Sequence, residues 1–387
     1  SLLVSTLGFL IVENGRFPAS NFYPIRDVSH LYEYYTEVFV KVQSYRNLNY
    51  QFDGPSHARK SITTVLAIGE ALRKDKMGIY SPELDTTPRL EEFISTNPDH
   101  FLVFADAIAS ACYTRVSVPS LLSVAPTVDF HEITKHPSII RIAETAGLPV
   151  SIISNQKKSG MNDSFIAAYF EDASRRNYLS RSEFSYDERL VKELKAELDE
   201  TQSTESMFIL RLAGSHWPYA KTYPGETGHY SSEENVNYYL NSVRYNDSVM
   251  RQLVDLVMSV DYPVVMVYLS DHGEYLDDFG DGKFGHGFRK FITRFETDIP
   301  FFIICNDRFL AEYPNEHSRM KSHRSKKISL DNLSHTLLGL NGLFDSSYRA
   351  EYDLSSENFQ ETTRYLVDRK NKILKFEGIQ FEGPASE

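Results

Sequence analysis

Short, continuous runs of apolar residues recur along the chain, and segments of helical length separate them. Such a run is typical of a strand that is buried on both faces, as in a parallel sheet covered by helices. Regular alternation of these strands with helices predicts βαβ units. We therefore expect an α/β fold with a mostly parallel central sheet sandwiched by helices. The predicted strands are 63–68, 101–104, 149–153, 207–210, 264–269 and 299–304.

Polar residues directly follow several of these predicted strands. Ligands bind at the carboxyl ends of the strands in open α/β sheets, where the strand ends share one edge. We therefore expect these polar groups to face one crevice, although they come from separate strands. They are Glu70, the Gly-Ser-His segment 214–216, the Ser-Asp-His-Gly segment 270–273 and the Cys-Asn-Asp segment 305–307.

The two ends of the chain differ from this pattern. Residues 1–60 are interpreted as a lead-in before one α/β domain that spans 61–387, with an aromatic-rich helix at 30–42. The apolar stretch 2–12 is shorter than the roughly 20 residues of a membrane span, so it is either the remnant of a membrane anchor or a buried strand or helix. Residues 365–381 predict two short strands around a polar turn, a small C-terminal edge of strands.

Composition narrows the classes of partner. The 41 Lys and Arg against 53 Asp and Glu give a net charge of −12, which argues against binding to nucleic acid. One basic block, 319–327, is either a solvated loop or a contact for anionic head groups. Only Cys112 and Cys305 carry thiols, so there is no disulfide framework and no cysteine-rich zinc module. The pair could be bridged or reduced.

Asp271 and His272 form the first candidate for catalytic chemistry. Both side chains can reach one ion where the strand breaks into a loop, and Gly273 supplies that break. Carboxylate oxygen and imidazole nitrogen suit Zn²⁺, although a capping turn is an equal alternative. Glu70 is a second candidate ligand, and alone it could simply favour a helix dipole.

Hydroxyl groups gather in the segment 110–123, which we expect to be a loop with a proline turn. A Ser or Thr hydroxyl is a poor nucleophile at its ordinary pKa, and a bound metal lowers that pKa. The alternative is a loop whose hydroxyls bond only to nearby backbone groups.

Taken in order, these motifs resemble the metal-dependent phosphoethanolamine transferases of the bacterial envelope, within the alkaline-phosphatase-like superfamily. The resemblance covers about residues 61–340. The positions that would hold a cysteine pair beside the hydroxyl-rich segment in many members are Ser110 and Ser120 here. The matching segments are 65–80 with 86–88, 114–119, 214–218, 241–248, 270–274 with 286–287, and 331–340.

The resemblance implies an alkaline-phosphatase-like fold and a set of site residues. Thr114 would be the nucleophile and would carry phosphoethanolamine as a covalent intermediate. His216 and His286 would bind the phosphoryl oxygens of the substrate or a second metal ion. One tightly held Zn²⁺ would be bound by Glu70, Thr114, Asp271 and His272.

The resemblance also implies an activity: transfer of phosphoethanolamine from phosphatidylethanolamine to an envelope glycolipid, either lipid A or a lipooligosaccharide core. We expect a monomer of the inner membrane whose catalytic domain faces the periplasm and works at a membrane surface. A phosphoglycerol transferase, or a phosphodiesterase or sulfatase of the same superfamily, is the near alternative. Sulfatase chemistry is disfavoured because Leu121 stands where the sulfatase signature needs Arg. A non-catalytic protein that binds envelope sugars is the distant alternative.

Overall fold

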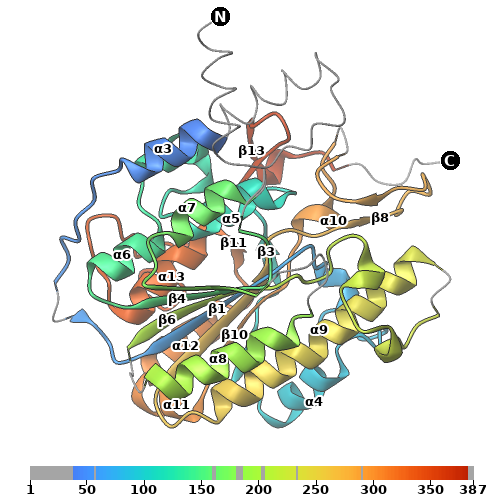
Figure 1. The fold of residues 1–387 in the computed structure, drawn as a ribbon, viewed down its shortest axis with the longest axis horizontal. Coiled ribbons are helices and arrows are strands. Elements are labelled where there is room, and N and C mark those ends of the chain that lie inside the picture. The colour runs from blue at the N-terminus through green and yellow to red at the C-terminus, as the bar shows by residue number, and fades with distance from the viewer. Residues whose placement is uncertain are drawn as a thin grey trace, which may run out of the picture.

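A seven-stranded sheet runs through the centre of the molecule, in the order β2-β10-β7-β1-β6-β4-β5 (Figure 1). The structure is a computed structural model, and it describes residues 38–55, 58–158, 163–179, 186–201, 205–231, 234–288 and 291–381. Every strand predicted from an apolar run is present in the sheet, which confirms the predicted α/β architecture. The strands are β1 (Thr63–Gly69), β2 (Phe101–Val103), β4 (Val150–Ser154), β5 (Arg175–Tyr178), β6 (Ser206–Arg211), β7 (Val264–Ser270) and β10 (Phe301–Cys305).

The central strand β1 lies between β6 and β7, and all three run parallel. Strand β10 runs antiparallel to β7, and β2 is antiparallel to β10. The prediction that 305–307 faces the same crevice as the other strand ends is therefore wrong, because the carboxyl end of β10 lies at the opposite edge. Asn306 has a structural role there: its Oδ1 accepts hydrogen bonds from the backbone N–H of Val264 and of Phe309, each at 3.0 Å.

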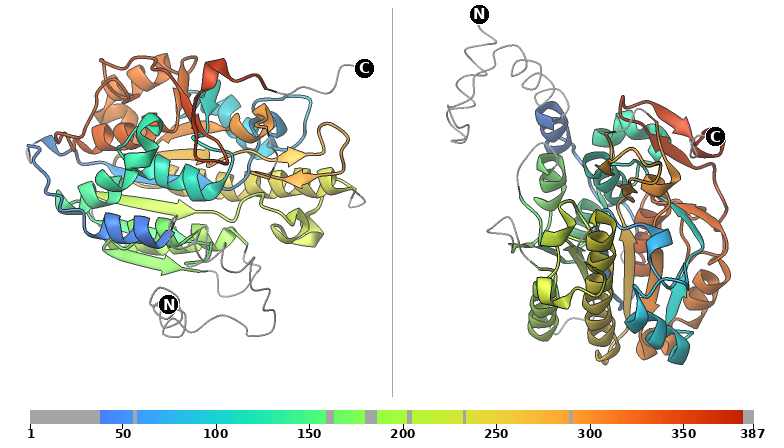
Figure 2. Two further views of the ribbon diagram at one scale, coloured as in Figure 1. Left: turned by 90° about the horizontal axis from the view of Figure 1, so that it is seen from above. Right: turned by 90° about the vertical axis from the view of Figure 1, so that its right-hand side faces the viewer.

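Helices cover both faces of the sheet, as the three views show (Figures 1 and 2). Side chains alternate along β1, so that Leu66 and Ile68 pack into one hydrophobic core and Val65 and Ala67 into the other. The first core contains α3 (Val40–Arg46), α5 (Thr114–Leu122), α6 (Ile139–Thr145), α7 (Ser164–Phe170) and α13 (Asp331–Asn341). The second contains α4 (Pro88–Thr96), α8 (Glu188–Thr201) and α9 (Asn235–Met258).

Small two-stranded sheets and short helices complete the described fold. The predicted C-terminal strands are present, and they pair with each other as a separate sheet that does not extend the central one. The small sheets are β3 (Asp106–Ile108) with β11 (Lys327–Ser329), β8 (Tyr275–Leu276) with β9 (Phe284–Gly285), and β12 (Tyr365–Val367) with β13 (Ile373–Lys375). The short helices are α10 (Arg294–Thr297), α11 (Asp307–Glu312), η3 (Lys74–Lys76), η4 (Thr127–Lys135), η5 (Tyr219–Lys221), η6 (Gly225–Thr227) and η7 (Phe376–Gly378).

The lead-in is described only from residue 38. The apolar stretch 2–12 and most of the predicted helix 30–42 lie outside the described residues. The described part packs on the α/β body: the Tyr45 ring lies 4.4 Å from that of Tyr169, centroid to centroid. Within the described ranges, no helix has the length and apolarity needed to cross a membrane. The domain boundary at residue 60 stays a prediction.

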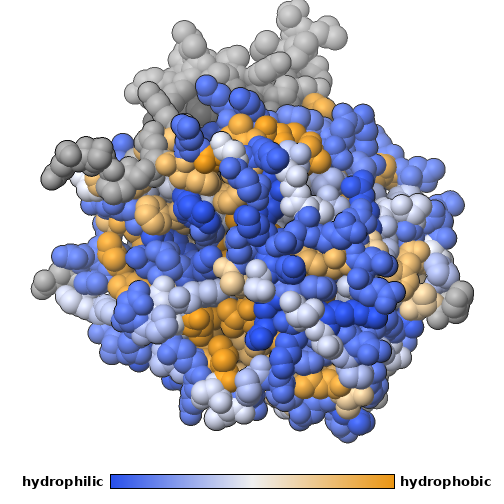
Figure 3. Space-filling model, turned by 180° about the vertical axis from the view of Figure 1, so that it is seen from behind, coloured by the Kyte–Doolittle hydropathy of each residue, from blue (hydrophilic) through white to orange (hydrophobic). Residues whose placement is uncertain are grey.

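The basic block 319–327 is only partly a loop. It begins inside α12 (Pro314–Ser322) and continues through a turn to β11. Its charges form ion pairs at the surface, with Lys321 Nζ 2.5 Å from Asp99 and Arg319 3.4 Å from Glu357. The face seen from behind is mostly hydrophilic, with hydrophobic residues in separate patches (Figure 3).

Candidate active site

Glu70 is positioned by a sharp turn at the end of β1. The next residue, Ala71, has a left-handed φ of 56°, which is uncommon for a residue with a Cβ. Its backbone N–H donates to Asp271 Oδ1 at 3.2 Å, and the N–H of Leu72 donates to Ser270 Oγ at 2.8 Å. The ends of the neighbouring strands β1 and β7 are thereby tied together, and Glu70 and Asp271 are fixed side by side.

Asp271 and His272 leave β7 where the strand ends, as predicted. Gly273 follows, and a Cβ at this position would collide with the carbonyl oxygen of Phe295. The N–H of Gly273 donates to Glu296 O at 2.8 Å. The glycine therefore allows the close backbone approach that turns the chain immediately after His272.

Thr114 is the first residue of α5, so the predicted loop around it is wrong. Eight of the nine residues of this helix are buried, and that packing outweighs the helix-breaking tendency of Pro119. The hydroxyls in the helix bond to backbone carbonyls: Ser117 Oγ donates to Asp271 O at 2.5 Å and Ser120 Oγ to Val116 O at 2.9 Å. Thr114 thus lies at a helix N-terminus, where unpaired N–H groups and the dipole favour an anion.

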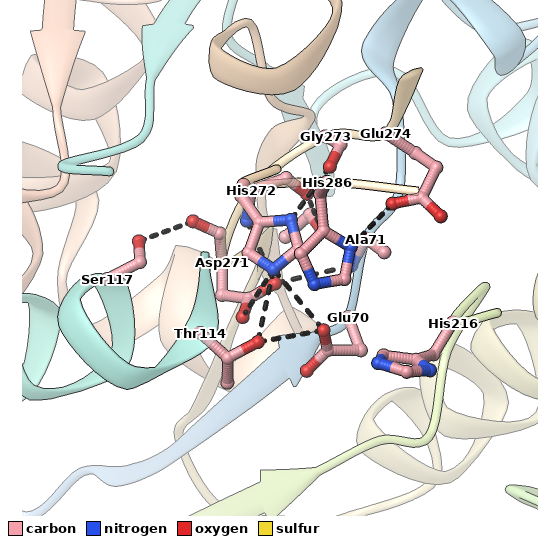
Figure 4. Close-up of polar contacts among 12 residues, drawn as sticks. Glu70, Ala71, Thr114, Ser117, His216, Asp271, His272, Gly273, Glu274 and His286 are labelled. Atoms are coloured by element: carbon pink, nitrogen blue, oxygen red, sulfur yellow. Dashed lines mark hydrogen bonds and ion pairs between the residues drawn. The ribbon is translucent and has the colours of Figure 1, made fainter. Parts of the chain in front are cut away.

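Four predicted residues meet in a buried cluster, drawn in Figure 4. Thr114 Oγ1 lies 2.9 Å from Glu70 Oε1 and 3.1 Å from His272 Nε2. His272 Nε2 lies 3.3 Å from Glu70 Oε1 and 3.5 Å from Asp271 Oδ2. The structure therefore brings Glu70, Thr114, Asp271 and His272 together, as the resemblance implied. We call them the inner cluster.

The donor set of the inner cluster fits a zinc ion. His272 Nδ1 lies 2.7 Å from the carbonyl oxygen of Gly273, so in the neutral form that binds a metal Nδ1 would carry the proton and the Nε2 lone pair would face the cluster. Asp271 Oδ2 is buried and has no hydrogen-bond partner. Zinc bonds of about 2.0–2.2 Å in a tetrahedron separate the ligand atoms by about 3.3–3.6 Å. The measured separations of 2.9–3.5 Å lie close to that range.

The electrostatics of the inner cluster also favour a cation. Burial raises the pKa of Asp271, and the neighbouring Glu70 raises it further. Burial also acts to raise the pKa of Glu70, but the hydrogen bond and charge of His272 hold it below its ordinary value. For His272, burial acts to lower the pKa, and the two carboxylates overcome this and raise it. Two buried acids thus require positive charge between them, which a metal ion would supply.

Two further histidines lie outside the inner cluster on loops. The ring of His286 lies 4.1 Å from that of His272, and the ring of His216 lies 5.4 Å from that of His286, centroid to centroid. His286 Nδ1 lies 2.7 Å from Glu274 Oε2. His216 is exposed, and Figure 4 shows its ring beside Glu70. We call His216 and His286 the outer histidines. Glu70 and the outer histidines have ligand atoms close enough to hold a second ion, as do His272, Glu274 and His286.

Sequence reasoning missed several residues that support the site. Glu274 ends the matching segment 270–274, and its Oε1 accepts from Tyr219 Oη at 2.7 Å. Gln156 Nε2 donates to Glu70 Oε2 at 3.0 Å, and Asp187 Oδ2 accepts from Gly214 N at 2.9 Å. The motif supplied a signal for Glu274, whereas nothing local marks Gln156 or Asp187.

The predicted helix motif at 241–248 lies on α9 and supports loops away from the inner cluster. Asp247 accepts hydrogen bonds from the backbone N–H groups of Arg89 and Leu90, each at 3.0 Å, at the start of α4. Asn241 Oδ1 accepts from the N–H groups of residues 229 and 230, each at 2.7 Å. Cys112 and Cys305 are both free and buried, so they are not bridged.

Residues 62–343 match the family model described as sulfatase. The chain belongs to the sulfatase family. Phosphoethanolamine transferase EptC of Escherichia coli is 25% identical over 338 residues, which cover 82% of this chain and 58% of that protein. Phosphoethanolamine transferase EptA of Helicobacter pylori is 27% identical over 302 residues, which cover 74% of this chain and 54% of that protein. This member of the sulfatase family thus spans a little more than half the length of these curated relatives.

Solved structures show the same fold. The C-terminal periplasmic domain of Escherichia coli EptC, in complex with zinc, has a TM-score of 0.77 at 24% identity, covering 86% of this chain and 97% of that one. The integral membrane protein lipooligosaccharide phosphoethanolamine transferase A of Neisseria meningitidis has a TM-score of 0.64 at 21% identity, covering 91% of this chain and 70% of that one. An alkaline phosphatase superfamily protein of Vibrio parahaemolyticus has a TM-score of 0.53 at 16% identity. These structures confirm the alkaline-phosphatase-like fold, and the sequence relatives named above confirm the resemblance drawn from the motifs.

Proposed function

We propose that this chain is the catalytic part of a zinc-dependent phosphoethanolamine transferase that modifies an envelope glycolipid, either lipid A or a lipooligosaccharide core. One observation carries the proposal: a threonine hydroxyl at a helix N-terminus lies within hydrogen-bond distance of both Glu70 and His272. A partnerless buried oxygen of Asp271 completes the cluster. These contacts support a metal site that contains its own nucleophile.

Glu70, Thr114, Asp271 and His272 would hold one zinc ion. When bound, zinc supplies Lewis acidity, which lowers the pKa of a threonine hydroxyl and offsets charge on a phosphoryl oxygen. The donor is phosphatidylethanolamine. Thr114 Oγ1 attacks its phosphorus, a new P–O bond forms, and the P–O bond to diacylglycerol breaks.

Two side chains would move protons in this first step: Glu70 and one of the outer histidines. The hydroxyl proton of Thr114 leaves along its hydrogen bond to Glu70, and the diacylglycerol oxygen takes up one proton from an outer histidine. In the second step an oxygen of the acceptor attacks the phosphorus of the phosphothreonine, a new P–O bond forms, and the P–O bond to Thr114 breaks. The outer histidine takes up the acceptor's proton, and the threonine oxygen recovers its proton from Glu70. The outer histidines also bind the phosphoryl oxygens, or they hold a second metal ion with Glu70.

A donor with two acyl chains requires work at a membrane surface. We propose that the chain acts as a monomer at the inner membrane with this domain, residues 61–387, facing the periplasm, and that residues 1–60 connect it to the membrane. Two of the similar structures support this placement, since one is a periplasmic domain and the other an integral membrane protein.

The decisive experiment measures both halves of the reaction. Purified protein is incubated with phosphatidylethanolamine and lipooligosaccharide, and mass spectrometry follows diacylglycerol release and the mass of the glycolipid. We expect a gain of one phosphoethanolamine, which requires metal and Thr114. Release without glycolipid gain identifies a phosphodiesterase and overturns the transferase proposal. A gain of phosphoglycerol from phosphatidylglycerol identifies the other near alternative.

Variants test the nucleophile. Thr114→Ala should abolish both products while the circular dichroism spectrum stays unchanged, and Thr114→Ser should retain part of the activity. Ser117→Ala is the matched control, since Ser117 lies one helical turn away and bonds to a backbone carbonyl. If Thr114→Ala stays active and Ser117→Ala does not, the assignment of Thr114 is wrong.

A further inference from the structure

An open groove of about 410 Å³ lies beside the outer histidines. Its volume falls in the range of about 300–1,000 Å³ that is usual for small-molecule sites. Aromatic rings and a few polar groups line it together. The lining residues are Trp217, Asn235, Gly282, Lys283, Phe284 and Phe288.

The groove continues directly from the proposed catalytic site. Trp217 follows His216 in the chain, and Phe284 and Phe288 each lie two residues from His286. The rings of His216 and His286 lie 5.4 Å apart, so the two segments that carry the aromatic lining residues come close together at the outer histidines. A molecule bound in the groove is therefore held next to the phosphoryl-transfer position.

The aromatic wall is built as a rigid platform. The Trp217 ring stacks on Phe284 at 6.3 Å with an interplanar angle of 26°, and the ring of Tyr219 meets it edge-on at 5.1 Å. Tyr219 is buried and anchored by its hydrogen bond to Glu274. Trp217, the only tryptophan of the chain, nevertheless leaves 43% of its surface exposed. A supported indole that stays exposed in a groove is available for a ligand.

The polar residues that line the groove indicate which class of ligand it binds. Lys283 and Asn235 line the groove together with the aromatic residues. Lys283 Nζ lies 3.5 Å from Asp281 Oδ2, and Asn235 is the first residue of α9. A sugar ring has an apolar C–H face that packs on indole and a polar edge that bonds to amide and ammonium groups. An acyl chain in the same place would bury Lys283 against hydrocarbon, which is unfavourable.

We propose that this groove is the subsite for the acceptor, and that it binds a sugar ring bearing an anionic group by stacking on Trp217 and by charge pairing with Lys283. The inference rests on the proposed transferase function, because it names the residues that select the acceptor at that same site. Binding itself requires neither metal nor turnover, so the two proposals can fail separately.

Because Trp217 is the only tryptophan, its fluorescence reports directly on the groove. The protein is titrated with glucosamine 1-phosphate, with N-acetylglucosamine, with inorganic phosphate and with a short-chain phosphatidylglycerol below its micelle concentration. We expect glucosamine 1-phosphate to change the fluorescence of Trp217 in a saturable way. The neutral sugar should produce the same change at roughly 10-fold higher concentration, and inorganic phosphate should produce none. A response to phospholipid alone assigns the groove to the lipid and overturns the proposal, as does no response to either sugar.

Variants separate stacking from apolarity and charge. Lys283→Met keeps the fluorophore, and we expect it to weaken glucosamine 1-phosphate about 10-fold and to leave the neutral sugar unchanged. In transfer assays we expect Trp217→Phe to keep most of the apparent affinity for the glycolipid and Trp217→Leu to raise its KM at least 10-fold. Tyr186→Ala, which removes an exposed aromatic residue outside the groove, is the matched control.

Three outcomes are decisive. Equal KM values for Trp217→Leu and Trp217→Phe overturn the stacking argument. Transfer by the wild type without any sugar response removes the subsite and leaves the transferase proposal standing. Sugar binding without transfer removes the transferase proposal and leaves a sugar site.

Discussion

The inner cluster and the outer histidines are built in different ways. Glu70 and Asp271 stand at the ends of adjacent parallel strands, and Thr114 begins a helix that packs on the sheet. His216 and His286 stand instead on connecting segments outside the central sheet, and His216 is exposed. Burial and strand pairing fix the first group, whereas the second depends on loops and on the support of Glu274.

This structural difference suggests that the inner cluster and the outer histidines have different roles in the proposed reaction. The inner cluster contains the candidate metal ligands and the proposed nucleophile, and its atoms are fixed by the fold itself. The outer histidines, together with the groove beside them, lie on segments that can vary without disturbing the sheet. We infer that the metal and the nucleophile reside in the inner cluster, and that the choice of acceptor resides in the groove beside the outer histidines.

The largest effect is expected from a change inside the inner cluster. Asp271→Asn keeps the size of the side chain and removes the carboxylate oxygen that has no hydrogen-bond partner. We expect zinc affinity to fall by about 100-fold or more and transfer to be lost with it. Metal analysis after dialysis measures the first, and the glycolipid assay the second. Full zinc content in this variant would contradict the proposed donor set.

Replacement of an outer histidine should act on the rate and spare the metal. We expect His286→Ala to lower kcat by about 10²–10⁴-fold, the range for a lost acid–base group, with one zinc still bound. His216→Ala should have a smaller effect, because its ring is more exposed. Loss of the tightly bound zinc in one of these variants would place the replaced histidine among the zinc ligands and contradict the distinction between the two groups.

The smallest effect concerns a buried carboxyl that lacks a cation among its hydrogen-bond partners. Asp331 Oδ1 accepts from Thr127 N at 2.9 Å and from Thr127 Oγ1 at 2.5 Å, and burial raises its pKa to about 6. Its ordinary value is near 3.9. The native state therefore holds this proton more tightly than the unfolded chain, so the contribution of Asp331 to stability is complete below about pH 4 and is lost as pH rises through 6.

Asp331→Asn should remove the loss of stability that the ionisation of Asp331 causes as the pH rises. Relative to the wild type, we expect the variant to gain stability between pH 4 and pH 6, by up to about 3 kcal/mol before any weakening of its hydrogen bonds is subtracted. Urea unfolding at pH 4.5 and pH 7.5 measures the difference. An equal difference at both pH values would show that burial alone does not disfavour the ionised acid, and would weaken the argument that the inner cluster needs a cation.

The sequence predicted the strands well where they are apolar and poorly elsewhere. Continuous apolar runs predict β1 and β7. Strand β5 lies at the edge of the sheet and has the polar sequence 175–178, so the apolar pattern does not predict it. An apolar run carries no information on direction, so the antiparallel course of β10 was missed. Helix α5 was missed because hydroxyls and Pro119 locally favour a loop, and only tertiary packing outweighs them.

The site was predicted through the order of its motifs. No single pair of residues would have assembled the inner cluster, since Thr114 lies 44 residues from Glu70 and 158 from His272 in the chain. The supports were less accessible. Gln156 donates a hydrogen bond to Glu70, which is 86 residues away in the sequence, and no local sequence pattern predicts this contact. Residues that position a site from a distant segment become visible only when the sheet is assembled.

The C-terminal hairpin has a consequence for the order in which the molecule is made. The N–H of Val367 donates to Ser110 O at 2.8 Å, and Tyr113 Oη donates to Asp368 O at 3.1 Å. These hydrogen bonds hold the segment 110–113, which immediately precedes Thr114, against the hairpin. During synthesis, that segment therefore waits for about 250 further residues before its last partners leave the ribosome, at about 5–20 residues per second. Thr114, the proposed nucleophile, is therefore among the first parts of the site to be translated and among the last to be held in place.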